Sequence, residues 1–83
     1  MMYAVEVFVT YKESILDPQG EAVRNAIHRL DFEQVKDVRI GKYFEINIEK
    51  TEEPIEEVVE SLCKNLLANP ILETYRYNIK EVN

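Results

Sequence analysis

Few side chains in this sequence are equipped for chemistry. His28 is the only histidine and Cys63 the only cysteine. A general base needs an orienting partner and a substrate pocket, and no residue stands at a triad spacing that would make His28 such a base. We interpret His28 as a solvated or interface side chain, and Cys63, at the edge of an apolar helical stripe, as a small core residue. A lone cysteine also excludes an intrachain disulfide and a multi-cysteine zinc site.

Carboxylates and glycines suggest no cofactor site either. Five glutamates gather between positions 52 and 60, but they lack the loop geometry that wraps a cation, so we interpret them as a solvated helix start. Gly20 and Gly41 are the only glycines, which excludes the glycine-rich loops that hold nucleotide phosphates. Gly20 is either neutral sequence drift or a position where another backbone approaches closely. We expect no catalytic, cofactor-binding or metal-binding residue in this chain.

The group Arg39-Ile40-Gly41-Lys42 has two interpretations. In the first, Gly41 supplies the backbone angle of a hairpin turn while Arg39 and Lys42 solubilise its tip. In the second, the two cations dock on an acidic or phosphate-bearing partner surface.

Length and charge narrow the class of protein. The 83 residues form one domain, 1–83, near the lower size limit for a self-sufficient core, so partner chains could supply missing burial. The formal charge of -6 disfavours nucleic acid and anionic membranes. No targeting segment or transmembrane stretch is evident, so we expect a cytoplasmic protein.

Alternating apolar residues predict a first strand over residues 3–11. Asp17 stands where a helix N-cap belongs, with Pro18 at the first helical position. The apolar positions that follow, to Leu30, predict a helix that covers one face of a sheet. A hairpin is predicted from the alternation of residues 37–40 and 44–49 about Gly41-Lys42.

Pro54 marks the start of a second helix, which Asn69-Pro70 ends, and a last strand follows around Tyr75 and Tyr77. The predicted fold is therefore α+β, a β-α-β-β-α-β ferredoxin-like antiparallel sheet of four strands with both helices on one face. Its second face would carry Ala4, Phe8 and Tyr43. We expect that face, or a strand edge, to be covered by another copy or a partner.

Several stretches closely resemble the PurS family, the small subunit of formylglycinamidine ribonucleotide (FGAM) synthase. The most specific are Leu16-Asp17-Pro18-Gln19-Gly20 and Val38-Arg39-Ile40-Gly41-Lys42, in this order and spacing; Leu67-Ala68-Asn69-Pro70 adds weaker support. The resemblance covers nearly the whole chain. It departs from the family at Asp31, where the family often has glycine, and at Lys12-Glu13-Ser14, where a Lys-Pro-Gly type approach is common.

The resemblance implies a role in the fourth step of purine biosynthesis, the ATP- and glutamine-dependent amidation of formylglycinamide ribonucleotide. In that family a large synthetase subunit (PurL-like) binds ATP with magnesium and a glutaminase subunit (PurQ-like) releases ammonia. The small subunit is a non-catalytic part of this ligase, self-associates as a dimer or higher homo-oligomer, and is needed for assembly and ammonia transfer.

Three segments are candidate subunit contacts: Asp17, Pro18, Gln19, Gly20, Arg39, Gly41, Lys42, Asn69 and Pro70. The alternative function is a small-molecule-binding regulatory module of the same fold. An enzyme acting alone is disfavoured by the lack of partners for His28 and Cys63.

Overall fold

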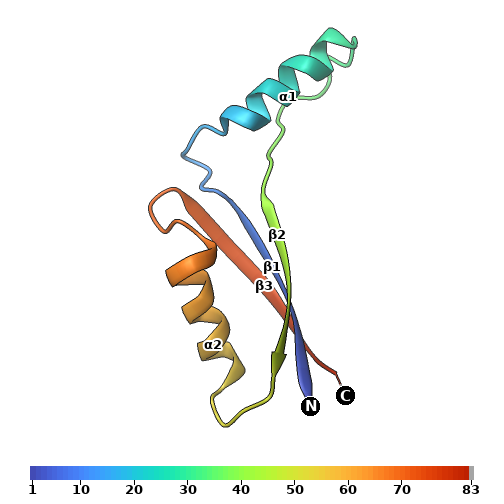
Figure 1. The fold of residues 1–83 in the computed structure, drawn as a ribbon. Helices are drawn as coiled ribbons and strands as arrows, with labels where there is room; N and C mark the ends of the chain where they lie inside the picture. Colours follow the sequence, from blue (N-terminus) through green and yellow to red (C-terminus); the bar gives the residue numbers. More distant parts are fainter. Residues whose placement is uncertain (83) are drawn as a thin grey trace.

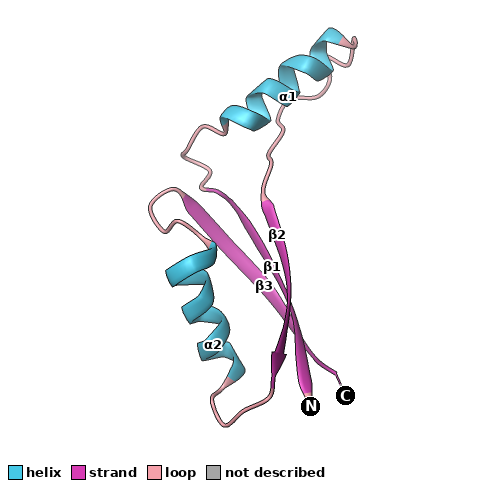
Figure 2. Cartoon of the chain, viewed as in Figure 1, coloured by secondary structure: helices cyan, strands magenta, loops and turns pink. Residues whose placement is uncertain are grey.

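The computed structural model describes residues 1–82 as a three-stranded antiparallel sheet with two helices. The elements are listed here in chain order: β1 (Met2–Tyr11), α1 (Pro18–Arg29), β2 (Lys42–Glu49), α2 (Ile55–Leu62), a π-helical turn (Cys63–Leu67) and β3 (Glu73–Val82). The long strand β1 lies in the centre, between β2 and β3 (Figure 2). The α+β class is confirmed, in the order β-α-β-α-β.

The prediction of a fourth strand was wrong, since the sheet of the described residues has three. Residues 38–40 are extended but pair with no strand among the described residues, and β2 begins only at Lys42. Gly41-Lys42 therefore forms no hairpin turn. The alternation of apolar residues there reflects extended backbone, which a strand pattern alone cannot distinguish from a paired strand.

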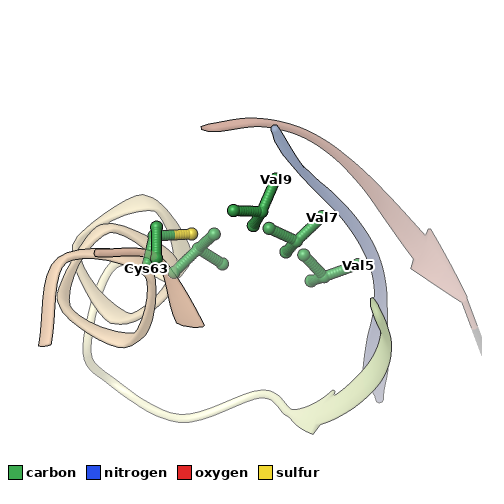
Figure 3. Packing of buried hydrophobic residues seen from close by; sticks show 6 residues of the cluster. Val5, Val7, Val9 and Cys63 are labelled. Carbon is green, nitrogen blue, oxygen red and sulfur yellow. The ribbon is translucent and has the colours of Figure 1, made fainter. Parts of the chain in front are cut away.

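The core lies between β1 and α2. Val5, Val7 and Val9 point from one face of β1 toward Cys63 on the helical side (Figure 3). Val59 and Ala68 complete this buried cluster. The register aligns Val7 with Phe44 on β2 and with Tyr77 on β3, so the same face is apolar across all strands. The period-2 pattern of the sequence is confirmed here.

The predicted position of α1 was also wrong. We expected both helices on one face of the sheet, but only α2 packs there. The helix α1 projects beyond the end of the sheet where β1 ends and β3 begins (Figure 1). We call residues 13–40, which contain α1, the arm. The Cα radius of gyration is 16.6 Å, with extents of 53 × 28 × 14 Å, whereas a compact domain of this length has a radius of about 12 Å.

Helix α1 begins as predicted, at Asp17 and Pro18. Its end reverses direction through Asp31, the only non-glycine residue with positive φ (71°) in residues 1–82. A left-handed residue directly after a helix is the usual place for glycine. Glycine would adopt the backbone angle of Asp31 without strain.

Candidate subunit interface

The root of the arm is built around Asp17. Its Oδ1 accepts a hydrogen bond from Gly20 N at 2.9 Å, which is the predicted N-cap. Its Oδ2 accepts a second one, from Ile40 N at 2.9 Å, across 23 residues of sequence. The bond from Ile40, followed by that from Gly20, lowers the pKa of Asp17 below its ordinary value of 3.8. Asp17 is buried, with 7% of its surface exposed, so it serves this chain internally.

Gly20 allows the two parts of the arm to approach. A Cβ at this position would lie 2.2 Å from the carbonyl oxygen of Val38, closer than any real contact. Of the two interpretations of Gly20, the close backbone approach is the one that the geometry supports. Pro18 and Gln19, between Asp17 and Gly20, are exposed and remain open to a partner.

Arg39, Gly41 and Lys42 lie where the arm returns to the sheet. Arg39 donates a hydrogen bond from Nη2 to the carbonyl oxygen of Lys12 at 3.1 Å. Gly41 lies against β1, since a Cβ there would be 2.4 Å from Val9 O. The Lys42 ammonium is 3.7 Å from a carboxylate oxygen of Glu73. Both cations stay exposed, so each could also meet a partner's acidic group.

The Asn69-Pro70 corner closes the loop between α2 and β3. Asn69 Oδ1 accepts from Ile71 N at 3.0 Å, and Asn69 N donates to Glu73 Oε1 at 2.8 Å. Asn69 and Pro70 are exposed, and the adjacent Ile71 has 76% of its surface exposed.

The three candidate segments meet at the arm end of the sheet. Glu73 touches both Lys42 and Asn69, while Lys12 touches Arg39 and also donates its N–H to Leu72 O at 2.9 Å. Sequence reasoning missed Glu73 and Lys12, because nothing in their local pattern shows which distant segments they join. A shallow cavity of about 540 Å³ also lies at the root of the arm, lined in part by Leu16, Asp17 and Arg39.

The second sheet face carries an aromatic group, as predicted for Phe8 and Tyr43. Their ring centroids are 4.9 Å apart, and the Arg76 guanidinium lies 4.1 Å from the centroid of Phe8. Tyr43 donates to Glu6 at 2.9 Å and is 3.1 Å from Glu45, and these hydrogen bonds raise its pKa. No helix of the described chain covers this face.

The remaining candidate residues make contacts within this chain. His28 Nε2 is 2.7 Å from Val35 O and so ties α1 to the loop that follows it. Cys63 is fully buried, and burial raises the pKa of its thiol. Glu60, from the glutamate series, accepts hydrogen bonds from Tyr75 at 2.5 Å and Tyr77 at 2.6 Å, which join α2 to β3. Within residues 1–82, no three His, Cys, Asp or Glu side chains are arranged to hold a metal ion.

Comparison with known proteins identifies the family. The PurS family model, "Phosphoribosylformylglycinamidine (FGAM) synthase", matches residues 4–81. The PurS subunit of Bacillus subtilis is 51% identical over 81 residues, covering 98% of this chain and 96% of that protein. The corresponding subunit of Methanocaldococcus jannaschii is 35% identical over 82 residues, covering 98% and 99%.

Solved structures agree with the fold. B. subtilis PurS superposes with a TM-score of 0.91 at 49% identity, over 95% of this chain and 99% of that one. A chain of the PurLQS structure from Thermotoga maritima matches with a TM-score of 0.83 at 27% identity, over 96% and 99%. The three-stranded sheet with its projecting helix is therefore shared with these proteins, and the chain belongs to the PurS family of FGAM synthase subunits.

Proposed function

We propose that this chain is a non-catalytic subunit that assembles a PurL-like synthetase and a PurQ-like glutaminase into a working FGAM synthase. The observation that carries the proposal is its match, over 96% of its length, to a chain of the T. maritima PurLQS structure. The two residues best suited to nucleophilic or acid-base chemistry also have internal roles: Cys63 lies in the core and His28 contacts Val35 O.

In this proposal ATP and magnesium bind to the synthetase, and this chain holds no cofactor. Its task is to keep the synthetase and glutaminase in register, so that ammonia passes between sites instead of escaping to water. The arm end of the sheet, where Arg39, Lys42 and Asn69 meet, is the proposed contact surface. In this proposal the complex works in the cytoplasm.

The test is to measure synthase activity of the matching PurL and PurQ subunits with and without this chain, using glutamine or free ammonia as nitrogen source. We expect the chain to be required for the glutamine-driven reaction and to leave the ammonia-driven reaction nearly unchanged. If neither reaction responds, the assembly role is wrong, and the small-molecule-binding module becomes the better hypothesis.

The segment from Arg39 to Lys42 offers a sharper test. Replacing both Arg39 and Lys42 by alanine removes two exposed cations and should weaken assembly while leaving the chain folded. The matched control is Lys36→Ala with Arg29→Ala, which removes two exposed cations of the arm that lie outside the segment from Arg39 to Lys42. Pull-down of the synthetase and glutaminase measures the difference. Equal assembly by both double variants would remove this segment from the proposed surface.

We also propose that the chain self-associates. Helix α2 lies on the β3 side of the sheet, where Glu60 meets Tyr75 and Tyr77. Over β2, the apolar row of Phe44, Ile46 and Ile48 stays only partly buried. The arm, meanwhile, holds Val23 and Leu30 exposed at 39% and 68%. A second copy could place its α1 over β2, which buries both apolar surfaces at once.

Sedimentation equilibrium tests this arrangement. The unmodified chain should form a dimer or larger oligomer at micromolar concentration, and Val23→Asp should shift it toward monomer. Asn25→Asp, which adds the same charge at another exposed position of this helix, is the control. A chain that is monomeric throughout this range would contradict self-association.

A further inference from the structure

The root of the arm is held to the returning segment by a single carboxylate. Asp17 Oδ1 bonds the start of α1 through Gly20 N, and Oδ2 bonds the segment before β2 through Ile40 N. At the same point Gly20 is so close to Val38 O that no side chain fits between them. The segment that leads from β1 into the arm and the segment that leads from the arm to β2 are therefore held together at this point.

The hydrogen bond from Ile40 N to Asp17 takes the place of a backbone hydrogen bond that a neighbouring strand would have provided. Extended residues 38–40 pair with no strand among the described residues, so their N–H groups need other acceptors. Asp17 supplies the acceptor for Ile40 N and is itself buried. Beyond it, the Arg39 bond to Lys12 O is exposed and therefore weaker. Asp17 is thus the buried hydrogen-bond link between the start of α1 and the segment that returns to β2.

We infer that Asp17 is a positioning residue for assembly: it sets the direction of the arm, and so how α1 is presented to another subunit, without touching that subunit. This inference rests on the proposed function. It also revises the role of Asp17 among the candidate contacts, since the buried carboxylate acts through α1 while the exposed Pro18 and Gln19 remain available to a partner.

The chemistry of the side chain supports this role. An ionised carboxylate accepts hydrogen bonds at both oxygens, whereas an amide has one accepting oxygen and one donating nitrogen. Asp17→Asn therefore keeps the size of the side chain but turns a donor toward either Gly20 N or Ile40 N. The lowered pKa of Asp17 fits a carboxylate held charged by both N–H groups.

The first experiment measures the direction of the arm. Spin labels on cysteines at exposed Asn25 in α1 and Asn78 in β3 report the distance between arm and sheet. An excess of unlabelled chain isolates the distance within one copy. The chain with its native Asp17 should give one narrow distribution of label-to-label distances, and the Asp17→Asn chain should give a broader or shifted distribution. Glu21→Gln, which removes a neighbouring carboxylate of the same helical turn, should leave the distribution narrow.

Gly20→Ala gives an independent check that changes no charge. Its Cβ must push Val38 O away, so the arm should move as it does in Asp17→Asn. Circular dichroism identifies any variant that fails to fold, and in that case the remaining variant decides. Distances that stay unchanged in a folded Asp17→Asn or Gly20→Ala chain would overturn the inference.

The second experiment measures assembly. The concentration of chain that gives half-maximal glutamine-dependent synthase activity should rise about tenfold for Asp17→Asn, the size expected for one charge-assisted hydrogen bond, and stay unchanged for Glu21→Gln. A moved arm with unaltered half-maximal concentration would overturn the positioning role. If the unmodified chain stimulates no activity, the proposed function fails, while the distance measurement still tests the Asp17 contact.

Discussion

The two halves of this molecule are held together in different ways. In the sheet half, α2 buries an apolar cluster of β1 valines with Val59 and Cys63, so the hydrophobic effect stabilises the structure directly. In the arm, α1 has only Gly20 buried and depends on polar contacts at its root. The difference teaches that the sheet half is arranged for stability within one chain, whereas the arm presents an amphipathic helix outward, with Val23 and Leu30 exposed.

The largest expected effect tests that division with a matched pair of valines. Val7→Ala leaves a cavity in the core, where Val7 is 0% exposed, and should lower the free energy of unfolding by about 2 kcal/mol. Val23→Ala on the arm, 39% exposed, should change it by less than about 0.5 kcal/mol. Urea unfolding at low protein concentration measures both. Equal losses would show that the arm already belongs to a single-chain core.

The second effect concerns alkaline pH in the sheet half. Hydrogen bonds to Glu60 raise the pKa of Tyr75 and Tyr77 to about 12 from 10.0. Their contribution is fully present below pH 10 and should be lost as the pH rises through 12. In Glu60→Gln, absorbance titration should show both tyrosines ionising nearer 10, with a lower temperature of unfolding. An unchanged titration curve would mean that the Glu60 contacts do not form in solution.

The third effect concerns acid and belongs to the arm. Because the pKa of Asp17 is lowered, its contribution is fully present above the ordinary value of 3.8 and is lost only below it, as the pH falls through the folded-state value. Amide hydrogen exchange should show the Ile40 N–H protected at pH 5, and Asp17→Ala, which leaves no side-chain acceptor, should remove that protection. Strong protection of Ile40 in the variant would argue for another acceptor.

The smallest effect is at the turn that ends α1. Asp31 holds a φ of 71°, which costs a non-glycine residue about 1 kcal/mol. Asp31→Gly relieves this strain but loosens the unfolded chain, so the net gain in stability should be at most about 1 kcal/mol. Thermal unfolding measures it, with Asp37→Gly as a control outside the turn. A destabilised Asp31→Gly chain would show that the Asp31 side chain matters more than its backbone.

Local patterns predicted the elements well and their assembly less well. The alternating residues of β1 and the Asp17-Pro18 helix start are confirmed, because the neighbouring residues determine both. The prediction for residues 38–40 was wrong, because extended backbone looks the same in sequence whether or not a strand pairs with it. Likewise, nothing local to α1 says that it leaves the sheet, and the second bond of Asp17 reaches 23 residues away.

The candidate contact residues also show that local sequence does not determine which distant segments meet. Their grouping at one end of the molecule depends on Glu73 and Lys12, which join segments far apart in the chain. The family resemblance selected these segments without indicating how they meet. Only the three-dimensional arrangement separates buried Asp17 and Gly20 from the exposed residues beside them.

The pairing of β1 with β3 has a kinetic consequence. Its register joins Met2 to Val82 and Tyr11 to Glu73, so every contact of this ladder closes a loop of most of the chain. Such closures are slow, and β3 is synthesised after all the other elements. The edge of β1 that pairs with β3 therefore stays without its backbone partners until residues 73–82 are free to pair, although β2 and α2 precede them in the chain.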